Sequence, residues 1–285
     1  MSGGLLSGRS RIAGIMGHPV GHSLSPRLHG HWLRRHRIDG AYIPMPVAPT
    51  DLEPALRALP KLGLRGCNLT IPHKEAALRI VDRASERATR IGAVNTVVVE
   101  ADGTLSGHNT DGYGFLESLH EVAAGGSPTR SLAVVIGAGG AARAIVVALQ
   151  DAGAPLIRVL NRTRDRADVL AEELHHRIEV ADWSERGRAV EGAALLVNTT
   201  SLGMVGQPSL DLPLDRLPES ALVADAVYIP LETPLLAAAR ARGNRCIDGL
   251  GMLLHQGRPG FEAWFGVRPE VDDDLRAVML EALGR

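Results

Sequence analysis

Two short polar segments carry side-chain types that can move a proton beside a hydroxylated small molecule. The first is Asn109-Thr110-Asp111, which is flanked by glycines and precedes a helix-like run. The second runs from Asn68 to Lys74 with the sequence Asn-Leu-Thr-Ile-Pro-His-Lys. Together they supply amides, hydroxyls, a carboxylate and a lysine. A site that binds a polyhydroxylated molecule and transfers a proton needs this set of groups.

Positive charge is carried almost entirely by arginine in this chain. Of the 31 basic residues, only Lys61 and Lys74 are lysines. An arginine does not lose its proton in a protein, whereas a lysine can be tuned to exchange one. Because Lys74 lies within a dense polar motif, we expect it to have a chemical role, while chance explains Lys61 equally well.

The composition is that of a globular protein, and it argues against several function classes. Hydrophobic residues make up 45% of the 285 residues and charged residues 22%, and the net charge is -1. This balance gives no electrostatic basis for binding nucleic acid, and no apolar run reaches the roughly 18 residues of a membrane helix. The Gly/Ser-rich start has no apolar signal core, and Cys67 and Cys246 have no metal or redox spacing. We expect a cytoplasmic monomer or homodimer that acts on a small molecule.

A glycine-rich turn predicts a dinucleotide site in the middle of the chain. The segment from Val134 to Ala142 has the pattern of an apolar strand, a Gly-Ala-Gly-Gly turn and the start of a helix. Glycines let the backbone turn beside a pyrophosphate, which the free amides and the dipole of a helix N-terminus attract. Alanine replaces the third glycine of the motif, which the motif permits. The alternative is a tight turn without a ligand. The residues assigned to the cofactor here are Gly137, Gly139, Gly140 and Ala141.

The residues after the next strand indicate which dinucleotide binds. An NAD site usually has Asp or Glu there to hold the ribose 2′-hydroxyl, whereas this chain has Asn-Arg-Thr-Arg-Asp-Arg at 161–166. Guanidinium groups suit an anionic 2′-phosphate because they form bidentate hydrogen bonds. We therefore expect NADP. The alternative is a solvent-exposed helix start, and Asp165 is the one feature that also fits NAD. The residues assigned to NADP here are Asn161, Arg162, Thr163 and Arg166.

Alternating strand and helix patterns predict an α/β fold of two domains. We expect residues 1–110 to form an α/β substrate domain, on which C-terminal helices in 250–285 pack, and residues 111–249 to form a Rossmann-type NADP-binding domain. A linker composition at 123–128 separates the two series, and a cleft between domains is a common place for a small-molecule site. The expected strands are 11–17, 41–47, 66–69, 97–100, 104–106, 132–136, 156–160, 194–197 and 222–224. The expected helices are one capped by Ser25, one started by a capping box at 50–53, those at 73–81, 250–264 and 271–283, and one that follows the glycine turn within 137–152.

Segments spread from residue 17 to residue 256 together match one family. They are Gly-His-Pro-Val-Gly-His-Ser-Leu-Ser-Pro at 17–26, Asn-Leu-Thr-Ile-Pro-His-Lys at 68–74, Ile-Gly-Ala-Val-Asn-Thr at 91–96, Asn-Thr-Asp-Gly at 109–112, Asn-Arg-Thr at 161–163, Asn-Thr-Thr-Ser-Leu-Gly-Met at 198–204, Asp-Ala-Val-Tyr at 225–228 and Gly-Leu-Gly-Met-Leu-Leu-His-Gln at 249–256. Each is weak alone, but jointly they are specific, and the chain resembles the shikimate dehydrogenases. The resemblance implies reversible, NADP-dependent reduction of 3-dehydroshikimate to shikimate in aromatic amino-acid biosynthesis.

The resemblance also implies a role for each matching residue. Lys74 and Asp111 correspond to the catalytic pair, and the chemistry agrees because reducing a ketone gives an alkoxide that needs a proton and a positive neighbour. Hydroxyls before a helix N-terminus suit a small anion, and amides suit alcohols. Asn68 is expected to brace its loop. The residues that correspond to substrate ligands are Ser23 and Ser25 for the carboxylate, Thr70, Asn95 and Gln256 for the ring hydroxyls, and Tyr228 near both substrate and nicotinamide. Two further residues in matching segments, Thr199 and Gly249, are assigned to the cofactor.

Several histidines crowd the matching segments and suggest a metal site at first sight. No cysteine or carboxylate ligands accompany a His-x-x-x-His pair there, and the family needs no metal, so we expect none. His22, next to Ser23, is placed to tune the carboxylate pocket, and we interpret the other histidines as polar packing residues.

Other hypotheses share part of this pattern. A quinate or quinate/shikimate dehydrogenase that prefers NAD would keep the fold, although quinate-selective members tend to carry Thr where this chain has Ser25. A non-catalytic sensor of the same metabolite would not need Lys74 and Asp111. Methylene-tetrahydrofolate dehydrogenases share the glycine turn and the Asn-Arg-Thr sequence, but the polar segments outside the nucleotide domain argue against them.

Overall fold

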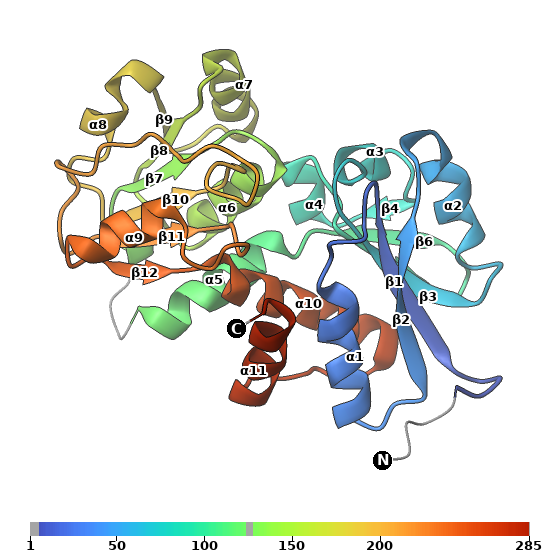
Figure 1. The fold of residues 1–285 in the computed structure, drawn as a ribbon. Helices are drawn as coiled ribbons and strands as arrows, with labels where there is room; N and C mark the ends of the chain where they lie inside the picture. The colour runs from blue at the N-terminus through green and yellow to red at the C-terminus, as the bar shows by residue number, and fades with distance from the viewer. Residues whose placement is uncertain (1–5, 124–127, 285) are drawn as a thin grey trace. The chain divides into compact units, whose positions relative to one another are not determined.

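The computed structural model describes residues 6–123 and 128–284, which fold as two α/β units (Figure 1). Unit 1 consists of Met1–Thr110 and Gln256–Arg285, and unit 2 consists of Asp111–His255. Within the described residues, each unit is built around a six-stranded sheet. The predicted α/β fold class is therefore confirmed. Most of the predicted linker, residues 124–127, lies outside the described residues.

The sheet of unit 1 is mixed, and its order is β2-β1-β3-β5-β6-β4. β1 runs parallel to β2 and β3, while β5 is antiparallel to both β3 and β6. The carboxyl ends of β1, β3 and β6 therefore lie at the same edge as the amino end of β5. The strands are β1 (Arg11–Gly17), β2 (Gly40–Pro46), β3 (Leu64–Leu69), β4 (Arg83–Ala84), β5 (Thr96–Val99) and β6 (Leu105–His108).

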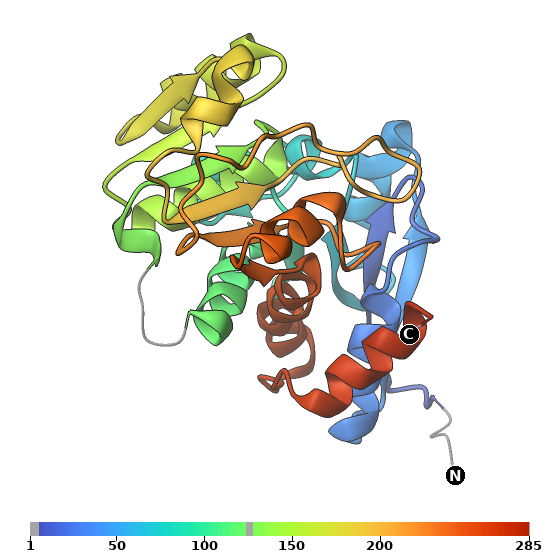
Figure 2. The same ribbon diagram turned by 60° about the vertical axis from the view of Figure 1, so that its left-hand side comes forward.

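Several of the few aromatic side chains of the sequence form one cluster in unit 1. Trp32, Tyr42, Phe261 and Trp264 surround His29, whose ring stacks on Tyr42 with centroids 3.9 Å apart. The helix α11 lies beside α1 (Figure 2). The helices of this unit are α1 (Ser25–Arg35), α2 (Leu52–Ala58), α3 (Lys74–Leu78), α4 (Glu86–Ile91), the second half of α10 (Gly249–Phe265) and α11 (Asp273–Ala282), with a 3-10 turn at Pro49–Asp51.

The sheet of unit 2 is entirely parallel, with the order β12-β11-β10-β7-β8-β9. The strand order reverses between β7 and β10, which is where doubly wound sheets bind dinucleotides. The strands are β7 (Ala133–Ile136), β8 (Ile157–Leu160), β9 (Ile178–Ala181), β10 (Leu195–Asn198), β11 (Leu222–Asp225) and β12 (Arg245–Ile247). The helices are α5 (Asp111–Val122), α6 (Gly140–Asp151), α7 (Arg164–Leu174), α8 (Arg186–Ala189), α9 (Pro234–Ala241) and the start of α10, with 3-10 turns at Pro128–Arg130 and Trp183–Glu185.

Two predicted helix caps are wrong. Leu24 rather than Ser25 precedes the first helical residue of α1, and Ser25 N instead donates to Ser23 Oγ at 3.3 Å. The capping box expected at Thr50 is replaced by a 3-10 turn, and no side chain caps α2. At the first place the side chain of Ser23 accepts the Ser25 amide in a local turn. At the second the 3-10 turn Pro49–Asp51 runs directly into α2. No helix in the described part of the chain is long and apolar enough to cross a membrane.

Candidate functional site

One edge of the sheet in unit 1 gathers the residues that the sequence assigns to the substrate. Ser23 and Ser25 follow β1, Thr70 and Lys74 follow β3, and Asn95 immediately precedes β5. Because the register pairs Met16 with Leu69 and Asn68 with Thr96, these segments lie side by side. Gln256 joins them from α10. The fold therefore brings together six residues that are spread over more than two hundred positions of the sequence.

Asn95 is held rigidly at this edge by its neighbours. Its side chain is buried, and its Oδ1 accepts hydrogen bonds from Thr110 N at 2.9 Å and Thr96 Oγ1 at 2.9 Å. Asn95 Nδ2 lies 3.1 Å from Thr110 Oγ1, which donates to Gln256 O at 2.9 Å. Asn95 and the backbone of Gln256 thus share one polar partner, and the side-chain amide of Asn95 has a fixed position.

A second set of hydrogen bonds connects this network to Ser25. Tyr42 Oη donates to Asn68 Oδ1 at 2.7 Å, and Asn68 Nδ2 donates to Asn95 O at 3.1 Å and to Thr96 Oγ1 at 3.0 Å. Ser25 is hydrogen-bonded to Tyr42. Burial raises the pKa of the Tyr42 hydroxyl well above its ordinary value. Asn68 therefore braces its surroundings, consistent with its expected role. No role was assigned from the sequence to Tyr42, which lies in no motif. Thr96 and Thr110 lie in matching segments, but their roles as hydrogen-bond partners of Asn95 appear only in the fold.

Lys74 is the first residue of α3 and is half-buried. Its carbonyl accepts a hydrogen bond from Val94 N at 2.8 Å, which fixes α3 against the segment that precedes Asn95. The neighbouring His73 is buried, and its Nε2 lies 2.8 Å from Val47 O. Both contacts anchor the start of this short helix, so the backbone of Lys74 is held beside the other polar residues of the edge.

The carboxyl edge of the sheet in unit 2 carries the glycine turn. Gly137 follows β7 with φ of 116°, and a Cβ there would lie 2.5 Å from Thr199 Oγ1, so a side chain does not fit. Thr199 Oγ1 itself donates to Ile136 O at 2.7 Å. A Cβ at Gly139 or Gly140 would meet nothing within 4 Å. No side chain caps α6, which leaves the amides of its first turn to an anionic ligand.

The segment after β8 presents arginines to solvent. Arg164 pairs with Asp168 at 3.3 Å and Asp182 at 2.5 Å, so its charge is already engaged. Arg162 and Arg166 are exposed, and neither forms an ion pair within the described residues. Asn161 Nδ2 donates to Thr163 O at 2.7 Å and stabilises this turn. The guanidinium groups of Arg162 and Arg166 can therefore bind an anion near the glycine turn.

Asp111 and Tyr228 belong to unit 2 as well. Asp111 is the first residue of α5 and is buried. The next residue, Gly112, allows α5 to pack closely on α6, because a Cβ there would lie 2.6 Å from Ala144 O. Tyr228 follows β11, and burial raises the pKa of its hydroxyl, so the side chain is a neutral donor at physiological pH. Gly249 begins α10, and its N donates to Val227 O at 3.1 Å.

Two histidines in or near the matching segments have structural partners. His29 is buried among aromatic rings, and burial lowers the pKa of its imidazole from 6.5 to about 3. His255 Nε2 lies 2.8 Å from Glu121 Oε1 within unit 2. Among the described residues, no group of three His, Cys, Asp or Glu is arranged to hold a metal ion.

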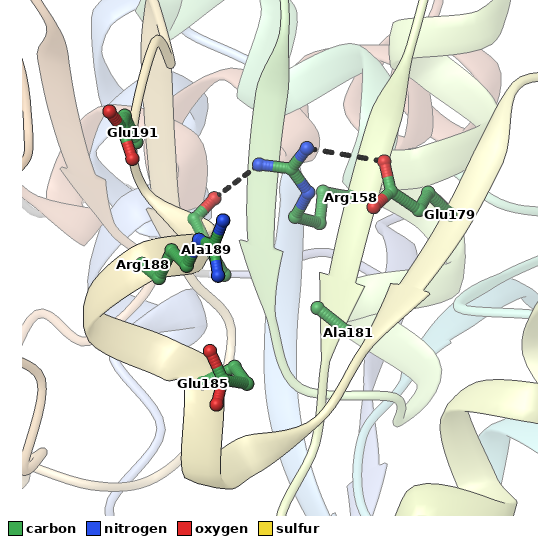
Figure 3. Close-up of a pocket in the computed structure, with 7 residues that line it drawn as sticks. All are labelled: Arg158, Glu179, Ala181, Glu185, Arg188, Ala189 and Glu191. Carbon is green, nitrogen blue, oxygen red and sulfur yellow. Dashed lines mark hydrogen bonds and ion pairs between the residues drawn. The ribbon is translucent and has the colours of Figure 1, made fainter.

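A separate hollow of about 360 Å³ lies beside β8, β9 and α8 in unit 2 (Figure 3). Arg158 crosses it, paired with Glu179 at 3.2 Å and donating to Ala189 O at 2.6 Å. Its lining contains none of the residues that the sequence assigns to a ligand. The hollow therefore does not belong to either polar edge.

Three family models match the chain. They are the shikimate dehydrogenase substrate binding domain over 15–97, shikimate / quinate 5-dehydrogenase over 123–204 and the shikimate 5′-dehydrogenase C-terminal domain over 249–282. A protein of Paramagnetospirillum magneticum named shikimate dehydrogenase (NADP(+)) is 60% identical over 96% of this chain and 100% of its own length. A protein of Rhodospirillum rubrum with the same name is 61% identical over 97% and 99%.

Solved structures with the same fold include ligand complexes. A shikimate dehydrogenase in complex with NADP+ has a TM-score of 0.90 at 32% identity and covers both chains completely. The enzyme of Thermus thermophilus in complex with NADP(H) and shikimate has a TM-score of 0.83 at 40% identity, over 96% of this chain and 99% of its own. A quinate dehydrogenase of Corynebacterium glutamicum in complex with NAD is similar too, with a TM-score of 0.88 at 32% identity over 95% and 99%.

Proposed function

Because the chain belongs to the shikimate dehydrogenase family, we propose that it catalyses the reversible, NADP-dependent reduction of 3-dehydroshikimate to shikimate in aromatic amino-acid biosynthesis. The observation that carries this proposal is identity of about 60% over nearly the whole chain with relatives named shikimate dehydrogenase (NADP(+)). Unit 1 is the substrate domain and unit 2 the NADP domain in this proposal. Because Cys67 and Cys246 are free thiols, we infer a reducing, cytoplasmic location.

The residues of unit 2 fit a bound NADP. The open glycines at 139 and 140 and the uncapped start of α6 suit the pyrophosphate. Arg162 and Arg166 suit the 2′-phosphate because both are exposed and unengaged. When bound, the reduced nicotinamide supplies the hydride. The other residues proposed to hold the cofactor are Gly137, Ala141, Asn161, Thr163, Thr199 and Gly249.

Unit 1 offers the groups that a hydroxylated carboxylic acid requires. Ser23 and Ser25 are proposed to bind the carboxylate, since their hydroxyls precede or begin α1. Asn95 and Gln256 are proposed to bind ring hydroxyls together with Thr70. The buried, fixed amide of Asn95 supports this role, because a preorganised donor and acceptor loses little entropy on binding. Tyr228 is proposed to contact the substrate as a neutral donor.

Lys74 and Asp111 are the proposed catalytic residues. Reduction of the ketone builds negative charge on its oxygen, and the ammonium group of Lys74 stabilises that charge and donates the proton. The carboxylate of Asp111 orients the substrate hydroxyl by accepting its hydrogen bond. In the reverse direction, Lys74 takes up the hydroxyl proton as the hydride leaves the ring carbon. Arginine would stabilise the charge without exchanging the proton.

The function is tested by following nicotinamide absorbance with purified protein, shikimate or quinate, and NADP or NAD in parallel. Rapid reduction of NADP with shikimate is expected, with NADP strongly preferred over NAD. A preference for quinate with NAD would instead identify a quinate dehydrogenase. Binding of NADP without turnover of either acid would favour the sensor hypothesis.

The cofactor preference is expected to depend on Arg162. Replacing it with alanine should weaken NADP binding about 10- to 100-fold, because a charge-assisted hydrogen bond contributes roughly 1.5–3 kcal/mol. NAD lacks the 2′-phosphate, so its affinity should hardly change. Arg164→Ala is the matched control, since that side chain is engaged by Asp168 and Asp182. Fluorescence titration with both cofactors measures the effect, and equal losses for NADP and NAD would contradict it.

A further inference from the structure

The carboxyl group of Asp225 is buried at the end of β11. Asp225 is not among the residues proposed to bind the ligands or to transfer the proton. Its Oδ1 accepts hydrogen bonds from Asn198 Nδ2 at 3.0 Å and Val227 N at 3.0 Å. Its Oδ2 accepts one from Thr233 Oγ1 at 2.7 Å. The three donors come from three places in the sequence, so one side chain connects them.

Asn198 carries the connection into the segment after β10. Its Oδ1 accepts from Thr200 N at 3.0 Å and Thr200 Oγ1 at 2.8 Å, and its Nδ2 also donates to Leu202 O at 3.1 Å. Asn198 therefore shapes the turn that begins with Thr199, whose side chain lies against the glycine turn. A displaced Asn198 would release that turn.

Val227 and Thr233 carry the connection into the segment after β11. Val227 N donates to Asp225, and Val227 O accepts from Gly249 N at 3.1 Å at the start of α10. Thr233 caps α9, accepting from Leu236 N at 3.3 Å. Tyr228 lies between these two anchored residues. The Asp225 side chain thereby fixes both ends of the short segment that presents Tyr228.

The electrostatic setting of Asp225 differs from that of a structural ion pair. Burial raises the pKa of its carboxyl from 3.8 to about 6, and the three hydrogen bonds oppose that rise. Within the described residues, none of the interactions that set this pKa is with a cation. At neutral pH the carboxylate therefore attracts its three donors strongly, because no counter-charge competes for its oxygens.

We propose that Asp225 is a positioning residue that holds the segments bearing Thr199, Tyr228 and Gly249 in their ligand-binding arrangement. The inference rests on the proposed function, which places these three residues against cofactor and substrate. Asp225 touches neither ligand and acts through Asn198, Val227 and Thr233. Removing its oxygens lets the segments move relative to one another, and a shift of about 1 Å in a reacting group can cost on the order of 10²-fold in rate.

The variants Asp225→Ala and Asp225→Asn distinguish a role in positioning the ligand-binding segments from a role in stability alone. The alanine variant loses all three acceptor contacts, and its kcat/KM for shikimate is expected to fall about 10²-fold. The asparagine variant can keep Oδ1 towards Asn198 and Val227 N and turn Nδ2 towards Thr233 Oγ1, so it should recover about tenfold of that loss. NADP affinity should fall less than kcat/KM in both variants, because Asp225 positions Thr199 and Gly249 but not the glycine turn or Arg162, which follow β7 and β8.

Asn244→Ala is the matched structural control. Asn244 is also buried in unit 2, and its Nδ2 donates to Pro218 O, Glu219 O and Ala221 O at 2.8–3.1 Å. It precedes β12 and so lies at the opposite edge of the sheet from Asp225. Asn244→Ala should lose stability as Asp225→Ala does but keep its kcat/KM at temperatures where it is folded. Equal kcat/KM losses in the two variants, or none in Asp225→Ala, would overturn the proposal.

Hydrogen exchange keeps the test independent of the assigned reaction. In Asp225→Ala, faster amide exchange is expected in residues 199–206 and 226–233 and not in 139–143. This pattern is measurable even if the wild-type protein does not oxidise shikimate, which would refute the proposed function alone. Should Asp225→Ala fail to fold, Thr233→Val removes a single donor and should give the same pattern with about a tenfold smaller loss of kcat/KM. Unchanged exchange in the variant that folds would refute the positioning role.

Discussion

Replacing Lys74 with alanine is expected to lower the turnover number for shikimate about 10³-fold, because general acid–base catalysis typically contributes 10²- to 10⁴-fold. The variant loses both the proton and the positive charge that the developing alkoxide needs. Initial rates of NADP reduction at saturating shikimate measure this effect. NADP affinity, measured by fluorescence titration, should be unchanged, since the cofactor residues belong to unit 2 and Lys74 to unit 1.

Two further variants make the Lys74 prediction specific. Lys74→Arg keeps the charge but cannot exchange a proton, so it should restore little of the lost turnover. Lys61→Ala removes the other lysine, which is exposed, and should behave as wild type. A Lys74→Ala enzyme that turns over at the wild-type rate would refute the proton-transfer role of Lys74.

Acid is expected to destabilise unit 1 through His29. Burial lowers the pKa of this imidazole from 6.5 to about 3. Between these two pH values the imidazole is protonated in the unfolded chain but neutral in the folded chain. The stability from this group is fully present above pH 6.5 and is lost progressively as the pH falls towards 3. At 1.36 kcal/mol per pKa unit, the whole difference amounts to about 5 kcal/mol, of which roughly 3 kcal/mol is lost by pH 4.5.

Urea unfolding at pH 7.5 and pH 4.5 measures the His29 effect. In His29→Phe the ring can still stack on Tyr42 but cannot titrate, so its stability should fall by about 3 kcal/mol less than that of the wild type between the two pH values. Comparing changes with pH cancels the constant cost of losing the hydrogen bond between His29 and Asn68. His120→Gln, at an exposed histidine, should keep the wild-type pH dependence. Equal acid losses in wild type and His29→Phe would rule out this mechanism.

The pattern of the sequence was enough to predict the fold class and several elements closely. The strand at 11–17 has the predicted bounds, and the strands expected at 97–100 and 104–106 form an antiparallel pair, β5 and β6. Buried parallel strands show as continuous apolar runs, and glycine turns have few alternatives. Some elements were not predicted, because their patterns are short or rich in charge. They are the helices α4, α7, α8 and α9 and the strands β4, β9 and β12.

The candidate site was predictable only where motifs mark it. Residues in dense polar segments, such as Asn95 and Lys74, could be chosen from the sequence. Tyr42 and Asp225 form hydrogen bonds with Asn68 and Asn198, which lie 26 and 27 positions away in the sequence. Only the pairing of the strands in the fold brings these partners together. The cap predicted at Ser25 was wrong because of a short-range contact rather than a distant one. The hydroxyl of Ser23 accepts a hydrogen bond from the amide of Ser25, two residues further on.

Tryptophan is distributed unevenly between the two units, so intrinsic fluorescence can distinguish the unfolding of one unit from that of the other. Trp32 and Trp264 are fully buried in the aromatic cluster of unit 1, whereas Trp183 is half-buried in unit 2 beside Arg186. Intrinsic emission is therefore dominated by two indoles in unit 1, while backbone circular dichroism samples both units equally. A difference between the midpoints of these two signals would reveal that the units melt separately, without any label.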